Sequence, residues 1–380
     1  MIVAAGSAAS LRPLLTMRRR TKITISIVAV VLLLLAGAIY LRKNAPPEVA
    51  RLLPDSDGII YLNLKPLREA THFDQHPVPH DPDYQHFIDA TGIQPERDLN
   101  QVAFALERMP DPNGPNGPVA FSEVFEGHFN GRRLADYLQT IAANTEPYAQ
   151  RTIFEIPSEG RTVRVVLLGY DLVAVSNTPT AEPIHSIIDR YRTAALPFAG
   201  SSLLAAHYSD VPLLSAAWGI GKIGLPLTDQ SGGIKVMGIS LPFSPDTTFI
   251  ASLRWTGKTH LRVEEIAPTE EAAAKSADAV GNLLNFVRTI QNAVTDTAHE
   301  QTNADLRAMI ESARIRHHND RAVFTATIPT DLLRQMMKAP IDLQTGPQPH
   351  VAPPQTTAPR PPAAPQLKKS QPKRRPAPSK

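Results

Sequence analysis

An uncharged stretch near the N-terminus restricts most strongly what this chain can fold into. Residues 23–41 read ITISIVAVVLLLLAGAIYL, which is nineteen residues without a charged side chain. A helix needs about 20 mostly apolar residues to cross the ~30 Å hydrocarbon core of a bilayer. The pattern therefore predicts a transmembrane helix over 23–41.

Basic residues flank this stretch unequally. Four precede it (Arg18, Arg19, Arg20 and Lys22) and two follow it (Arg42 and Lys43). By the positive-inside rule, residues 1–22 should stay in the cytoplasm. Everything from the linker 42–48 onward should then be periplasmic or extracellular, which predicts a single-pass protein of the bacterial inner membrane. Met17, directly before the arginines, is a second candidate start of translation.

A cleaved signal peptide is the alternative interpretation of the same stretch. Ala36-Gly37-Ala38 fits the small-x-small pattern of a cleavage site that follows an apolar core. Both interpretations export the rest of the chain, so both predict a protein of the bacterial envelope. With no cysteine in 380 residues, a lipid anchor on cysteine, disulfides, Fe–S clusters and cysteine-ligated zinc are excluded.

The net charge of +3 is the sum of three segments with different charges. Residues 1–43 and 350–380 each carry seven basic residues and no acid, so 44–349 has 25 basic residues and all 36 acids, a net −11. An acidic body argues against nucleic acid as the partner, despite a pI near 9.

Residues 49–340 alternate between strand and helix patterns, which predicts an α+β body with a mainly antiparallel sheet. Strand patterns cover 58–64, 101–107, 119–126, 152–156, 162–168, 172–176, 247–255, 260–266, 314–317 and 322–328. Helix patterns follow Asn130 and cover 184–191, 269–294, 304–313 and 332–337. The 247–266 pair should be a hairpin that turns at Thr256-Gly257.

Three strand-to-helix junctions share one local sequence, in which a proline and a threonine precede an acidic residue. They are Pro179-Thr180-Ala-Glu182, Pro268-Thr269-Glu270-Glu271 and Pro329-Thr330-Asp331. Proline ends a strand because it cannot donate to the ladder, and threonine can cap the helix that follows. The recurrence predicts two ββαββα-like repeats, 49–200 and 201–340. The tail 341–380 is rich in proline and basic residues and is predicted to be disordered.

At this point the chain resembles uncharacterised single-pass envelope proteins of bacteria, in which an exported domain of α+β repeats opens with a phrase like Leu53-Pro54-Asp55-Ser-Asp57-Gly-Ile-Ile-Tyr61-Leu-Asn-Leu64. The resemblance covers the layout of about 17–340. It implies an envelope location and an α+β repeat fold, and it implies no activity.

The candidate metal ligands are His72, His76, His80 and His86, which lie among three aspartates. Imidazole and carboxylate suit zinc or another divalent ion. Pro77, Pro79 and Pro82 forbid a continuous helix there, so an irregular loop would have to bring the ligands together. The competing interpretation is a solvated polar loop and no cofactor.

Other motifs indicate no reaction. Gly219-Ile-Gly221-Lys-Ile-Gly224 matches a dinucleotide-binding fingerprint in letters alone, because no acid follows about twenty residues later and Pro226 interrupts the expected helix. Glu264 and Glu265 are adjacent on a predicted strand, so their side chains should point to opposite faces. No motif predicts an enzyme.

The sequence thus favours a non-enzymatic, membrane-anchored envelope protein whose body binds a protein or another envelope component, with the groove between the two halves as the first place to look. One alternative is a metal-dependent envelope hydrolase that uses the His72–His86 loop. The other is a structural tether whose basic tail contacts the cell wall or an anionic polymer. The oligomeric state is left open.

Overall fold

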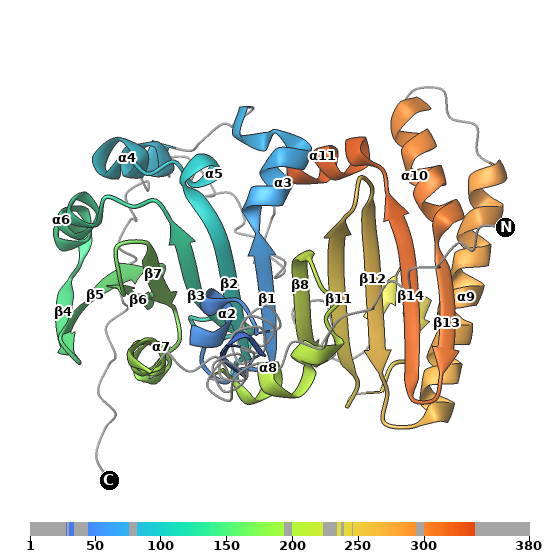
Figure 1. Ribbon diagram of the computed structural model, residues 1–380, viewed down its shortest axis with the longest axis horizontal. Helices are drawn as coiled ribbons and strands as arrows, with labels where there is room; N and C mark the ends of the chain where they lie inside the picture. The colour runs from blue at the N-terminus through green and yellow to red at the C-terminus, as the bar shows by residue number, and fades with distance from the viewer. Residues whose placement is uncertain are drawn as a thin grey trace, which may run out of the picture. The chain divides into compact units, whose positions relative to one another are not determined.

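Twelve strands pair into one antiparallel sheet that runs across the molecule (Figure 1). The structure is a computed structural model, and it describes residues 28, 30–33, 45–75, 82–193, 200–222, 234–236, 239–244, 246–293 and 300–338. The strands of the sheet are β1 (Gly58–Asn63), β2 (Leu99–Arg108), β3 (Val119–Gly127), β4 (Asn144–Tyr148), β5 (Arg151–Ser158), β6 (Arg161–Leu167), β7 (Leu172–Ser176), β8 (Ser215–Lys222), β11 (Thr248–Trp255), β12 (Thr259–Ile266), β13 (Arg314–His318) and β14 (Arg321–Ile328). Their spatial order is β13-β14-β12-β11-β8-β1-β2-β3-β7-β6-β5-β4.

The helices connect these strands and cover parts of both sheet faces (Figure 1). They are α2 (Glu48–Leu52), α3 (Leu64–Thr71), α4 (Pro82–Thr91), α5 (Pro95–Asp98), α6 (Gly131–Ile141), α7 (Glu182–Arg192), α8 (Ser202–His207), α9 (Glu270–Ala293), α10 (Glu300–Ser312) and α11 (Thr330–Lys338). Two short 3-10 turns, Phe73–Gln75 and Tyr208–Asp210, and a separate two-stranded ladder of β9 (Ile234–Val236) and β10 (Ile239–Leu241) complete the described elements.

The two halves of the chain join in the middle of the sheet, where β1 pairs with β8. The register of this pair places Gly58 opposite Gly221 and Ile60 opposite Gly219. On one side of the pair the order is β1-β2-β3-β7-β6, and on the other it is β8-β11-β12-β14-β13. In each half, the strand that comes last in the sequence (β7 or β14) therefore lies beside the third strand (β3 or β12). The first half also adds the hairpin β4–β5 at its edge. The sequence boundary predicted at 200/201 falls inside one continuous sheet.

One face of the sheet is sealed by α2, α7 and α8. Ile184, Ile187 and Ile188 of α7 have no exposed surface, and they join strand residues such as Ile59 and Val124 in the main apolar core. Fully burying a side chain of this size contributes about 1.5–3 kcal/mol. On the opposite face a smaller core forms beneath α6.

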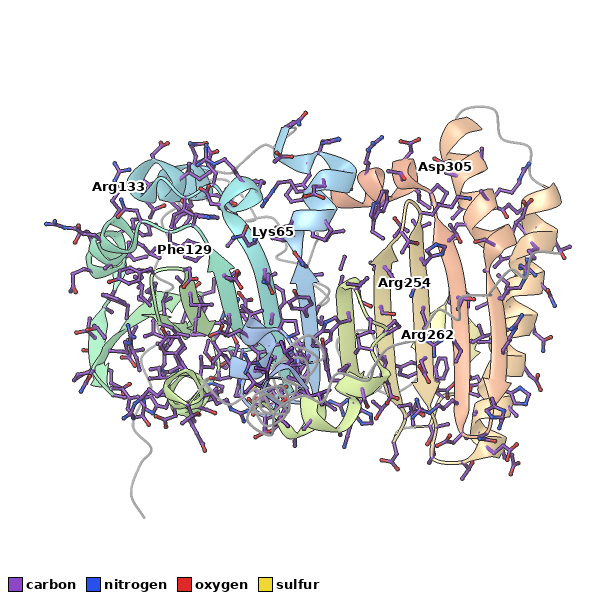
Figure 2. The ribbon with its side chains drawn as sticks, viewed as in Figure 1. Lys65, Phe129, Arg133, Arg254, Arg262 and Asp305 are labelled. Atoms are coloured by element: carbon purple, nitrogen blue, oxygen red, sulfur yellow. The ribbon has the colours of Figure 1, made fainter. Side chains whose placement is uncertain are left out.

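Beyond β8, the face that carries the main core becomes polar. Strand alternation places Arg254, Arg262 and Arg316 on this face, together with the buried Glu264. Figure 2 shows Arg254 and Arg262 on the neighbouring strands β11 and β12. Glu264 is 3% exposed, and its carboxylate accepts hydrogen bonds from Arg262 at 2.7 Å and from Arg321 at 2.8 Å. Glu264 is therefore neutralised within this face.

The fold-class prediction is wrong in its transmembrane helix. In the part of the chain that the structure describes, no helix is both long enough and apolar enough to cross a membrane. Of the predicted span 23–41, only residues 28 and 30–33 are described; they are helical, with side chains 52–72% exposed. The described chain is an α+β protein built on a twelve-stranded antiparallel sheet.

Candidate functional site

A cavity of about 570 Å³ lies between α9 and the sheet, on the face opposite the main core. This volume falls within the range of small-molecule binding sites. Its lining is largely apolar and comes from both halves of the chain. The sheet contributes Ile60, Leu106, Phe249, Ala251, Val263, Ile315 and Phe324, α9 contributes Ala277, Val280 and Leu283, and the segment from β10 contributes Leu241 and Phe243.

Three glycines remove side chains from the floor of this cavity. Gly58 of β1 and Gly219 and Gly221 of β8 all line it, and the β1–β8 register places Gly58 beside Gly221. A Cβ atom on Gly221 would lie 3.2 Å from the Cα atom of Gly58, so a side chain there would require the backbone to shift by a few tenths of an ångström. Above the floor, α9 presents the small residues Ser276 and Ala277. Small residues on both sides leave the volume open.

Phe243 and Phe249 form part of the wall on the side of β10. Their ring centroids are 5.0 Å apart, and the ring planes stand at 89°. This edge-to-face arrangement is a favoured geometry for aromatic pairs. It presents aromatic surface to the cavity from β11 and from the segment that follows β10.

Glu265 is the acidic side chain among the described lining residues. It is 4% exposed, and its Oε2 atom accepts a hydrogen bond from the hydroxyl of Ser276, which is itself fully buried. Burial raises the pKa of Glu265, because the charged form loses its hydration, although the Ser276 hydrogen bond acts in the opposite direction. Lys222, the cationic side chain among these residues, is exposed at the end of β8.

A second carboxyl group lies on the same sheet face, two strands from Ile60. Glu123 of β3 is half-buried and stands opposite Phe104 of β2 and Val175 of β7. Along its own strand, Phe121 and Phe125 point to the same face. Burial among these apolar side chains raises the pKa of Glu123 to about 7.

The hollow beside α7 has polar walls, and its groups already bind one another. The rings of Tyr148 and His185 stack with centroids 3.8 Å apart. His185 Nε2 lies 2.8 Å from Glu146 Oε1, and the Tyr148 hydroxyl donates to Asp189 at 2.9 Å. These contacts attach β4 to α7, so we assign this cluster a structural role.

The structure places the two predicted metal ligands that it describes on different elements. His72 follows the end of α3 in a left-handed conformation, with φ of 52°, and its N–H donates to the carbonyl of Arg68 at 2.8 Å. His86 lies on α4, where its ring is 6.0 Å from that of Tyr137. His76 and His80 lie outside the described residues. Among the residues that are described, no group of three or more metal-ligating side chains is close enough to hold an ion. The four-histidine site stays a prediction.

The sequence motif that matches a dinucleotide-binding fingerprint in letters contains two glycines that line the cavity, where their role is different. Gly219 and Gly221 belong to a strand, β8, and line the cavity, while Gly224 lies outside the described residues. The signal was available in the alternation of Ala217, Gly219 and Gly221, since small residues at every second position leave one face of a strand bare. Glu264 and Glu265 point to opposite faces, as the alternation predicts.

Comparison with known proteins shows similarity to solved structures alone. No protein-family model and no curated protein matches the sequence. The chain is similar to crystal form III of TP0453, with a TM-score of 0.43 and 9% identity over 77% of this chain and 98% of that chain. Crystal form IV of TP0453 gives a TM-score of 0.40 and 10% identity over 77% and 96% of the two chains. Similarity at this level supports no functional argument.

Proposed function

We propose that this chain is a non-catalytic binding protein that holds an elongated apolar ligand, such as the hydrocarbon chain of an amphiphile, in the cavity beneath α9. The observation that carries this proposal is the cavity of about 570 Å³ with its largely apolar lining. Apolar walls with a few polar groups are typical of sites for small organic ligands. The cavity also takes residues from both halves of the sheet.

The magnitude of the hydrophobic effect sets an upper limit on the affinity for such a ligand. Burial of hydrocarbon contributes about 0.8 kcal/mol per methylene. Ten buried methylenes would therefore supply ~8 kcal/mol before the losses of ligand freedom are subtracted. A dissociation constant in the micromolar range corresponds to about −8 kcal/mol, so micromolar affinity is the upper limit for ten buried methylenes, and the losses of ligand freedom weaken it.

The proposal places the protein in the bacterial envelope, where amphiphiles with long apolar chains are present. This part rests on sequence: basic residues at 18–22 and a following uncharged stretch are typical of an export signal. The envelope role therefore has a separate basis from the cavity, and each can be tested without the other.

The two alternative functions depend on residues that are described partly or not at all. The metal-dependent hydrolase requires His76 and His80, and the tether to an anionic polymer requires the tail 341–380; all of these lie outside the described residues. Both stay predictions, and no described contact favours either of them.

The proposed function is tested by titrating the full chain with 1-dodecanol in a calorimeter and by following thermal unfolding at each concentration. We expect saturable binding of about one molecule per chain. Because a ligand at 100 times its dissociation constant adds about 2.7 kcal/mol to the free energy of unfolding, the melting temperature should rise by several degrees. Non-saturable uptake with an unchanged melting temperature would contradict the proposal.

A further inference from the structure

The acidic residue in this cavity has few partners for its degree of burial. Glu265 is 4% exposed and projects from β12 toward α9. Within the described chain, its carboxyl group has one hydrogen-bond partner, the Ser276 hydroxyl at Oε2. That hydroxyl also lies 3.1 Å from the carbonyl oxygen of Ala273, so its single proton is shared between two acceptors.

The adjacent glutamate provides a contrast. Glu264 is buried to the same degree on the opposite face, but Arg262 and Arg321 donate to its two oxygens. Buried carboxylates ordinarily have partners of this kind, because an unpaired charge in an apolar environment is costly. Glu265 has an apolar environment and no cationic partner among the described residues. A donor inside the cavity, from water or from a ligand, can therefore complete its hydrogen bonding.

We propose that Glu265, with Ser276 beside it, forms the polar end of the cavity and selects apolar ligands that carry a hydrogen-bond donor, a hydroxyl or an amine, over ligands that carry a carboxylate. This inference rests on the proposed function, since it names the chemistry of the ligand in the same site. A hydroxyl serves Glu265 in both protonation states because it can donate and accept. An ammonium group adds charge attraction in a site from which water is largely removed. A ligand carboxylate would place two anions together in that site.

Lys222 lines the same cavity and offers a second contact for a charged ligand group. The competing arrangement is therefore a ligand bound in the opposite direction. If the ligand entered in the opposite direction, its carboxylate would pair with the exposed ammonium group of Lys222, and Glu265 would meet the end of the hydrocarbon chain. The buried carboxyl group would then keep its unfilled hydrogen-bonding capacity. The geometry therefore favours a donor at Glu265, and the two directions of entry predict opposite ligand preferences.

The test compares three ligands with the same twelve-carbon chain, dodecanol, dodecylamine and dodecanoate, on the full-length protein and its Glu265→Gln variant at pH 8. We expect the wild type to bind the alcohol and the amine at least about tenfold more tightly than the carboxylate. In Glu265→Gln the three affinities should converge to within about threefold, with weaker amine binding and stronger carboxylate binding. Tightest binding of dodecanoate, or an unchanged order in Glu265→Gln, would overturn the inference.

A second variant keeps the inference testable if Glu265→Gln does not fold. Ser276→Ala removes the neighbouring donor and leaves the carboxyl group, so the preference for the amine over the carboxylate should persist or increase. Loss of that preference in Ser276→Ala would also overturn the inference. Failure of the proposed function gives a different result, in which none of the three ligands binds the wild type. Equal binding of all three contradicts only the assignment of Glu265.

Discussion

Replacing Ala277 by phenylalanine should reduce the affinity for dodecanol at least about tenfold and leave the protein folded. Ala277 is 5% exposed and lines the cavity from α9. The added ring would occupy space that the ligand needs, and a tenfold loss corresponds to about 1.4 kcal/mol. In a well-packed core the same change typically costs 1–3 kcal/mol of stability, because neighbouring groups must move. Here the cavity accepts the ring, so the melting temperature should stay the same or rise.

The matched control is Ala274→Phe, on the same helix. Ala274 is half-exposed and lies outside the cavity lining, so a phenylalanine there changes the composition of α9 equally and leaves the cavity open. Calorimetric titration of both variants separates the two effects. If Ala277→Phe bound dodecanol as the wild type does, the ligand would have to occupy some other place.

Replacing Glu123 by glutamine should make the protein more stable at pH 8 and change its stability little at pH 4. The pKa of Glu123 is raised by burial from 4.5 to about 7 in the folded state. Between these values the folded state holds the proton that the unfolded state has released, so the free energy of unfolding falls as pH rises. Above pH 7 the loss is complete. Each pKa unit corresponds to about 1.4 kcal/mol, so the gain at pH 8 should be on the order of 1–3 kcal/mol.

The measurement is urea-induced unfolding of the wild type and Glu123→Gln at pH 4, 6 and 8. The control is Glu69→Gln, which changes an exposed glutamate on α3 and should produce no such pH-dependent difference. A wild type whose stability relative to Glu123→Gln stays level or increases from pH 4 to pH 8 would show that burial does not raise the pKa of Glu123.

Much of the fold can be predicted from local sequence signals, but the pairing of β1 with β8 at its centre cannot. The hairpin of β11 and β12 turns at Gly257, whose φ of 80° favours glycine, and the turn could be identified from that residue alone. The helix predicted over 269–294 matches α9, and Thr269 accepts a hydrogen bond from the N–H of Ala272 as its cap. The β1–β8 pair that unites the halves depends on contacts between segments far apart in the chain. No local pattern specifies such a pairing.

The junction before α7 shows where local reasoning fails. Thr180 was expected to cap this helix, but Ala181 occupies the cap position, and no side chain makes a capping hydrogen bond there. The carbonyl oxygen of Thr180 instead accepts from the Thr178 hydroxyl at 3.0 Å and from Arg164 at 3.2 Å. The carbonyl of Thr180 is thus bound by a side chain of the neighbouring strand β6 and by Thr178, and neither contact belongs to the local capping pattern.

Individual features of the site could be predicted from the sequence, but the contacts that bring them together could not. Alternation alone showed that Glu264 and Glu265 point to opposite faces, but which face carries the cavity depends on where α9 packs. Gly58 and Gly221 create the open floor together, and their pairing is known only from the register of β1 and β8. The apolar stretch 23–41 illustrates the opposite case. Its composition predicts a membrane-spanning helix, and the described helices do not include one.

The central claim, that the cavity beneath α9 holds an apolar chain, is tested most directly by photolabelling. The full-length protein is irradiated with a twelve-carbon alcohol that carries an alkyl diazirine in its chain, and the labelled peptides are identified by mass spectrometry. We expect adducts on peptides from α9, β11 and β12, which excess dodecanol should suppress and Ala277→Phe should prevent. Labels that lie on other elements, or that persist in Ala277→Phe, would contradict the account.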